Sequence, residues 1–165
     1  MNHSNSSPKY DVPFDIDHFR KKSERGESLS LKNTFEEIYG TNLWNSGVSV
    51  SGNGSDSIQT AEISRHLPRL LKEYRIETML DLPCGDFNWM STLDLGNIRY
   101  VGGDIVEDII VRNQKNYGND SRRFEVLDLT RDPLPQTDLI FCRDCLVHLS
   151  YRDIRAAIEN IERCG

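Results

Sequence analysis

The sequence predicts an α/β protein built around a doubly wound parallel sheet. Short apolar runs alternate with helical patterns in the C-terminal half of the chain, and the connections between them are short. The first run, Thr78–Leu82, leads into a Pro-Cys-Gly turn that ends at Gly85. Acidic residues end three of the runs, at Asp81, Asp104 and Asp128. Parallel strands with helical crossovers bring such ends to one edge, where doubly wound sheets bind ligands.

The strands of this sheet are expected where apolar segments are bounded by turn residues. Ser150 and Asp153 have the spacing of a capping box at the start of the last helix. Pro133 and Pro135 mark a loop, because proline lacks a backbone N–H and disfavours helix before it. We predict strands over residues 78–82, 99–104, 124–128 and 138–142, and helices over residues 88–93, 106 or 107 to 117, and 151–163.

Two helices are predicted upstream of the first strand. Apolar residues recur at helical spacing over residues 31–39, and a glycine follows as a stop signal. A second helix over residues 57–74 begins with Asp56 or Ser55 as its N-cap. Pro68 lies inside this helix and should kink or split it.

The segment between these helices, residues 42–56, is rich in Gly and Ser and is therefore a loop with many free backbone donors. It is either a flexible linker or a loop that lies over a bound cofactor. Trp44 favours the second interpretation, because a flexible linker has little use for a large aromatic side chain. We divide the chain into a flexible polar leader, residues 1–30, the N-terminal helices with their cofactor-covering loop, residues 31–76, and the sheet-containing core, residues 77–165.

Composition argues against several classes of function. The 165 residues fit one domain, and the net charge of −6 disfavours nucleic acid as a main partner, since phosphate binding calls for a basic face. No run approaches the ~20 apolar residues of a membrane helix. The polar start, Met1–Pro8, lacks the apolar core of a signal peptide. We therefore expect no membrane partner and a cytoplasmic location.

The cysteines are expected to be reduced thiols and not a disulfide framework. Cys142, Cys145 and His148 lie at a spacing that invites a zinc interpretation. Three neighbouring ligands are fewer than the four of a structural zinc site, and Cys142 belongs to a buried strand. We therefore expect no metal.

Four motifs together resemble the class I S-adenosylmethionine-dependent methyltransferases. They are Leu80–Gly85, Asp104, Asp128 and Arg143–Leu149, and the resemblance covers residues 57–165. It implies a Rossmann-like sheet of seven strands, of which this chain supplies about four, so that the chain corresponds to the N-terminal part of the fold with the C-terminal strands missing. It also implies transfer of a methyl group from S-adenosylmethionine to a small or medium-sized acceptor molecule.

The resemblance assigns a part of the cofactor to each acid. Asp104 follows Asp81 by 23 residues and would bind the ribose hydroxyls, although it is alternatively only a cap of the next helix. Asp128 and the Leu129 backbone would meet the adenine amino group, although Asp128 is alternatively an acid at a turn. Asp81 and Asp86 would face the cationic methionine end.

Further site residues follow from the same resemblance. Backbone donors of the Gly- and Ser-rich loop would hold the cofactor carboxylate. Asp144 and His148 are the catalytic candidates that would remove a proton from the acceptor or orient it, although they are alternatively an acid at a helix start and a packed histidine. Methyl transfer is an in-line displacement on a charged sulfonium, for which alignment can suffice without a base. The loop candidates are Ser51, Gly52, Gly54 and Ser55, and the other cofactor-binding candidates are Trp44, Pro83, Cys84, Gly85, Trp89, Ile105 and Arg143.

The turn departs from the family's glycine pattern at Pro83 and Phe87. We therefore expect a turn shaped by proline, with a bulky ring close to the site. The alternatives are a nicotinamide-dependent oxidoreductase, which the acids on both the second and third strands disfavour, and a non-catalytic cofactor-binding domain. With four strands, the last would be an exposed edge, so we expect an oligomer or a partner to cover it.

Overall fold

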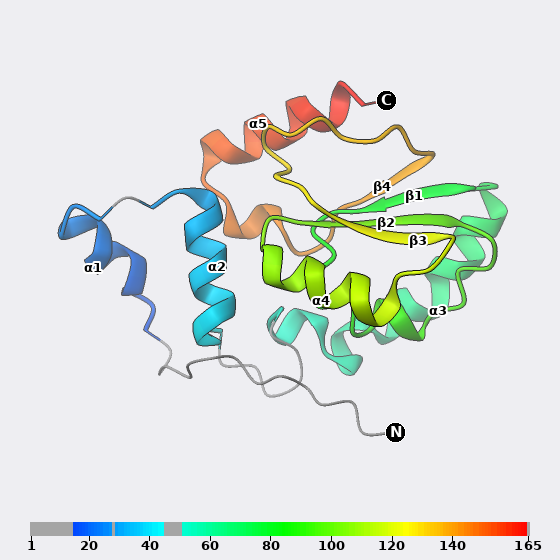
Figure 1. Cartoon of the computed structure of the whole chain (residues 1–165), viewed down its shortest axis with the longest axis horizontal. Coiled ribbons are helices and arrows are strands. Elements are labelled where there is room, and N and C mark those ends of the chain that lie inside the picture. The colour runs from blue at the N-terminus through cyan, green and yellow to red at the C-terminus, as the bar shows by residue number, and fades with distance from the viewer. Residues whose placement is uncertain (1–14, 28, 45–50, 165) are drawn as a thin grey trace.

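Four parallel strands form a sheet in the order β3-β2-β1-β4. The computed structural model describes residues 15–27, 29–44 and 51–164 (Figure 1). Within them the order of the strands reverses between β1 and β4, so the carboxyl end of β1 is a switch point of the kind at which open α/β sheets bind ligands. The predicted doubly wound parallel fold is thereby confirmed. The strands are β1 (Thr78–Asp81), β2 (Arg99–Asp104), β3 (Arg122–Val126) and β4 (Leu139–Phe141).

Helices cover both faces of the sheet. Successive strand residues point to opposite sides, and both sides carry apolar residues that need to be buried. Met79 and Tyr100 belong to one apolar core, which α3 (Ser57–Glu73) and α4 (Glu107–Tyr117) close. Their neighbours Leu80 and Val101 belong to a second core, which α5 (Tyr151–Glu162) closes from the other side (Figure 1). The strand ends are left open between these layers.

Two predicted elements are wrong in detail. The helix expected over residues 88–93 is only a 3₁₀ turn, η2 (Met90–Thr92), because Phe87 has a φ of +57° and turns the chain out of helical geometry. Helix α3 runs unbroken through Pro68, so the predicted split does not occur. Burial of Leu67 and Leu71 on either side of the proline stabilises the helix against its missing hydrogen bond.

Strand boundaries also shift. The third strand was expected over residues 124–128 and lies at Arg122–Val126, so Asp128 stands two residues beyond its end. The sequence pattern fails here because Val126 is exposed while Leu127 and Leu129, beyond the strand, pack into the core. Strand β4 is the edge of the described sheet, as the four-strand count predicts.

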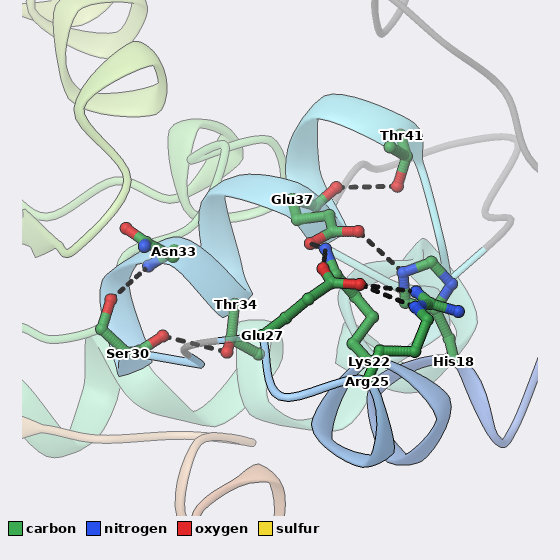
Figure 2. A network of polar contacts seen from close by, with 9 residues as sticks. All are labelled: His18, Lys22, Arg25, Glu27, Ser30, Asn33, Thr34, Glu37 and Thr41. Atoms are coloured by element: carbon green, nitrogen blue, oxygen red, sulfur yellow. Dashed lines mark hydrogen bonds and ion pairs between the residues drawn. The ribbon is translucent and has the colours of Figure 1, made fainter.

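The N-terminal helices form a separate arm beside the sheet (Figure 1). Helix α1 (His18–Glu24) lies within the segment predicted as leader, and α2 (Leu31–Thr41) runs two residues past its predicted end to a left-handed Asn42. Figure 2 shows the polar contacts between them. Glu37 on α2 lies 2.7 Å from His18 Nε2 and 2.6 Å from Lys22 Nζ on α1.

Some expectations fall on residues that the structure does not describe. These are the start of the leader, residues 1–14, and part of the Gly- and Ser-rich loop, residues 45–50. In the remainder of the chain, no helix has the length and apolar character needed to cross a bilayer.

Candidate active site

A pocket opens at the carboxyl ends of the strands, between the sheet, helix α2 and the segment that follows β4. It has a volume of about 1050 Å³, including the part that is open to solvent. Most of its lining is apolar, with a few convergent polar groups, as is usual for small-molecule sites. The predicted site residues that line it are Trp44, Ser51, Ser55, Asp81, Pro83, Cys84, Gly85, Trp89, Asp104, Ile105, Asp128, Leu129, Arg143, Asp144 and His148.

The turn after β1 forms the floor of this pocket. The Leu82–Pro83 peptide bond is cis, and the Cys84 N–H donates to the Gly103 carbonyl at 2.7 Å, which fastens the turn to β2. Gly85 has a φ of +54°, a backbone conformation that glycine adopts readily. A Cβ at this position would lie 2.4 Å from Ser51 Oγ. The absence of a side chain therefore lets Ser51 approach the turn closely.

Side chains from two distant segments hold the same turn. Asn113, a fully buried residue of α4, donates from Nδ2 to the Gly85 carbonyl at 2.7 Å. The backbone N–H of Asp86 donates to Ser51 Oγ at 2.9 Å. Neither partner could be paired with the turn from sequence, because both contacts depend on the tertiary fold.

Asp104 ends β2 and is buried at the pocket floor. Its carboxylate accepts hydrogen bonds from the Gly85 N–H at 3.1 Å and the Val106 N–H at 3.0 Å. Burial raises the pKa of Asp104 to about 6, although these backbone donors oppose the shift. Each carboxylate oxygen still has a lone pair available for a ligand hydroxyl. Asp104 can therefore accept hydrogen bonds from the backbone before the next helix and from a ligand at the same time.

Asp81 ends β1 beside Asp104. It accepts a hydrogen bond from the buried Tyr100 hydroxyl at 2.5 Å. Burial raises the pKa of Asp81 to about 7, the Tyr100 bond opposes this, and the nearby Asp104 charge adds to it. Two buried carboxyl groups at one edge make the pocket favourable for a cationic or hydrogen-bond-donating ligand.

Asp128 lies on the pocket rim with much of its carboxylate already occupied. Oδ1 accepts from the Thr130 N–H at 2.9 Å and from the Thr130 hydroxyl at 2.6 Å. Oδ2 lies 3.0 Å from Arg131 Nε. Asp128 is thus an acid that stabilises a turn, as one of the two predictions had it, and it also lines the pocket.

The Gly- and Ser-rich loop meets the segment after β4 across the pocket mouth. Arg143 donates from a terminal guanidinium nitrogen to the Gly54 carbonyl at 2.9 Å, and its guanidinium lies 5.8 Å from the centre of the Trp89 ring. The Asp144 carboxylate lies so close to Gly54 that a Cβ there would be 1.9 Å from Oδ2. Gly52 and Gly54 shape the loop without lining the pocket.

Aromatic rings close the mouth from the other side. The Trp44 and His148 rings have centroids 5.0 Å apart, and Phe35 meets Trp44 edge-on at 6.3 Å. Tyr39, on the next turn of α2, also lines the pocket. Trp44, which was predicted to belong to a loop over a bound cofactor, thus lines the pocket.

Two expectations about the turn are not met. Phe87 was expected close to the site, but it is 1% exposed and packs in the core against Tyr100, Tyr117 and Phe124. Its positive φ carries the ring away from the pocket. Asp86 does not line the pocket either, although its backbone N–H donates to the pocket residue Ser51.

Sequence reasoning missed the contribution of α2 to the site. The helical spacing of apolar residues predicted the helix, but it did not show that these residues would line a pocket. The α2 residues that line the pocket are Leu31, Phe35, Ile38 and Tyr39.

Cys142 and Cys145 are free thiols near the pocket, and a hydrogen bond from Cys145 lowers the pKa of Cys142. Across residues 15–27, 29–44 and 51–164, no group of three or more His, Cys, Asp or Glu side chains is arranged to hold a metal ion.

The fold is shared with solved structures of low sequence identity. No protein-family model and no curated protein matches the chain. The structure is similar to magnesium protoporphyrin IX methyltransferase from Synechocystis PCC 6803, solved with bound S-adenosylmethionine, at 17% identity and a TM-score of 0.62, covering 84% of this chain and 73% of that one. It is similar to the PH0226 protein from Pyrococcus horikoshii OT3 at 22% identity and a TM-score of 0.54, covering 68% of this chain and 55% of that one.

A third similar structure, the 4+2 cyclase SpnF, has 17% identity and a TM-score of 0.51, with 93% of this chain covering 58% of that one. The chain therefore has the fold of the class I S-adenosylmethionine-dependent methyltransferases, as the sequence motifs predicted. It spans about half to three quarters of the length of these proteins. Because a cyclase has the same fold, the reaction has to be argued from the site.

Proposed function

We propose that this protein binds S-adenosylmethionine in the pocket at the strand ends and transfers its methyl group to a small or medium-sized acceptor. The observation that carries the proposal is the Asp104 carboxylate, buried at the end of β2 and held by the Gly85 and Val106 N–H groups. A carboxylate in this setting gains from hydroxyl donors, which the two adjacent hydroxyls of a ribose supply.

The residues around Asp104 fit the remaining parts of the cofactor. Ile105, next to Asp104, and Leu129, next to Asp128, line the pocket and would offer apolar surface to an adenine ring. Asp81 would stabilise the positive charge of the methionine end. Ser51 and Ser55 line the pocket beside the turn and would hold the cofactor carboxylate.

S-adenosylmethionine would supply a methyl group on a positively charged sulfur. The residues of the chain would then bind and align the acceptor and exclude water from the site. Asp144 and His148 line the pocket mouth and would accept a proton from an acceptor hydroxyl. The apolar wall of α2 would keep bulk water from the reacting atoms.

Calorimetric titration with S-adenosylhomocysteine and, separately, with NAD tests the proposal. S-adenosylhomocysteine should bind, and Asp104→Asn should weaken this binding by about 10- to 100-fold, since charge-assisted hydrogen bonds are lost. Asp94→Asn is the matched control, because Asp94 is an exposed loop acid outside the pocket. Tighter binding of NAD than of S-adenosylhomocysteine would support the oxidoreductase and overturn the proposal.

A second candidate is a protein that binds the same cofactor without transferring methyl groups. The fold alone does not specify the reaction, because the similar structures include a cyclase as well as a methyltransferase. A protein of this kind would bind S-adenosylhomocysteine and release none of it when S-adenosylmethionine is supplied with a panel of acceptors. Accumulation of S-adenosylhomocysteine with any acceptor would exclude it.

A further inference from the structure

The apolar face of α2 is divided between the protein interior and the pocket, because Ile38 is buried while Leu31, Phe35 and Tyr39 are half-buried. The apolar side chains Leu31, Phe35, Ile38 and Tyr39 repeat at helical spacing and line the pocket. Neither of the two cores contains any of them. An amphipathic helix normally buries its apolar stripe against the protein interior, so this stripe has the character of a ligand-binding wall.

Two contacts between α2 and the sheet-bearing part of the chain involve charged side chains. Lys32 Nζ lies 3.9 Å from Glu107 Oε2, and the Arg112 guanidinium lies 5.9 Å from the centre of the Tyr39 ring. Both partners belong to α4. These contacts join α2 to α4, and Leu31, Phe35 and Tyr39 remain partly exposed in the pocket.

The polar groups of the pocket fall into two sets. Asp104, Asp128 and the Arg143 guanidinium already have hydrogen-bond partners in the protein. The ring of His148 and the carboxylate of Asp144 have no such partner among the described residues. Both side chains are exposed and line the pocket, and the His148 ring lies against Trp44.

The charge of the pocket restricts the acceptor further. Among the described residues, four aspartates and one arginine line it, so acidic side chains outnumber basic ones. An anionic acceptor is therefore disfavoured. A hydroxyl becomes a better nucleophile when a neighbouring group accepts its proton, and the ring of His148 can serve as that group.

We propose that α2 and His148 form the acceptor subsite, and that it takes a neutral, planar, apolar molecule with a hydroxyl group, of the phenol class. The ring of the acceptor packs against Phe35 and Tyr39, and its hydroxyl donates a hydrogen bond to a ring nitrogen of His148. This inference rests on the proposed function, because the cofactor fills the part of the pocket at the strand ends.

The experiment measures binding of 7-hydroxycoumarin, a fluorescent planar phenol, to the whole chain saturated with S-adenosylhomocysteine, at a pH that keeps the probe neutral. Phe35→Ala and Tyr39→Ala should each weaken binding by about tenfold, from the loss of apolar contact. Tyr151→Ala is the matched control, since Tyr151 is 93% exposed on α5 and outside the pocket. It should leave binding unchanged.

Coumarin, which lacks the hydroxyl, isolates the contact with His148. The wild type should prefer 7-hydroxycoumarin over coumarin by about fivefold, the value of one net hydrogen bond. His148→Phe keeps a ring against Trp44 but removes both ring nitrogens, and it should abolish the preference while leaving coumarin binding intact. A preference that survives in His148→Phe overturns the assignment of the hydroxyl.

The remaining outcomes separate this inference from the proposed function. If S-adenosylhomocysteine does not bind, both fail together. If it binds and 7-hydroxycoumarin does not, only the acceptor subsite fails. If Phe35→Ala and Tyr39→Ala weaken S-adenosylhomocysteine and 7-hydroxycoumarin equally, α2 covers the cofactor and the subsite is again overturned.

Discussion

Gly85 occupies a position that excludes a side chain on two separate grounds. Its φ of +54° costs an L-residue roughly 1 kcal/mol, and a Cβ would lie 2.4 Å from Ser51 Oγ. We expect Gly85→Ala to lower the free energy of unfolding by about 2 kcal/mol and to weaken S-adenosylhomocysteine binding. Urea denaturation and calorimetry measure the two effects.

The two grounds can be separated in a Ser51→Gly background. Without the hydroxymethyl group, only the conformational cost should remain, so Gly85→Ala should then cost about 1 kcal/mol. An equal cost in both backgrounds would mean that the close approach to Ser51 does not matter.

The acids of the site were predictable from sequence, but their partners were not. Asp81 and Asp104 follow apolar runs, and a parallel sheet brings the ends of its strands together. Tyr100 and Asn113 looked like ordinary core residues of a strand and a helix. They hold Asp81 and Gly85 only because β2 and α4 pack beside the turn. Contacts of this kind depend on tertiary structure and leave no local pattern.

At the scale of elements, helix α1 is held to α2 mainly by the side chain of Glu37 (Figure 2). Burial raises the pKa of Glu37, but the hydrogen bonds with Lys22 and His18 outweigh it and hold that pKa below its usual range. We expect Glu37→Gln to loosen α1 by about 1 kcal/mol, which would speed amide hydrogen exchange in α1 about fivefold. The melting temperature should change by less than about 2 °C, because α1 belongs to neither core.

Glu24→Gln is the control for this change. Glu24 pairs with Arg20 at 2.6 Å inside α1, so its loss removes a charge without releasing the helix from α2. Faster exchange in both variants would show that any lost ion pair frays α1. The docking role of Glu37 would then be wrong.

Local patterns located elements better than they assigned their faces. The spacing in α2 predicted a helix near its observed bounds, yet the same spacing is expected whether the apolar face meets a core or a ligand. The helix predicted after Gly85 is wrong for a different reason. Its polar residues are compatible with a helix start, and only the left-handed Phe87 redirects the chain.

At the scale of the whole molecule, the fold was the most predictable feature. Alternating strands and helices with short connections leave few topologies for a parallel sheet, and the order β3-β2-β1-β4 is one of them. Two aspartates buried at the sheet edge give this fold an unusual dependence on pH, because burial raises the pKa of Asp104 to about 6 and of Asp81 to about 7.

The sign of that dependence follows from where the proton is held more tightly. Asp81 binds its proton more strongly in the folded protein, at a pKa of about 7, than at its ordinary value of 3.8. The folded state therefore carries more protons between about pH 4 and pH 7. The contribution of Asp81 to stability is fully present below pH 4 and is lost as the pH rises through about 7.

Asp81→Asn removes this loss while the amide oxygen still accepts the Tyr100 hydroxyl. Relative to the wild type, the variant should gain up to ~4 kcal/mol in free energy of unfolding between pH 4 and pH 8, the free-energy equivalent of the pKa difference. Urea denaturation across this pH range measures it. Asp138→Asn should show the opposite sign, because the backbone N–H groups of Glu77 and Thr78 lower the pKa of Asp138. That variant should lose stability at pH 7 and recover toward the wild type as the pH falls below 4. An Asp81→Asn protein with no gain at pH 8 would mean that the folded chain holds this carboxylate charged without cost.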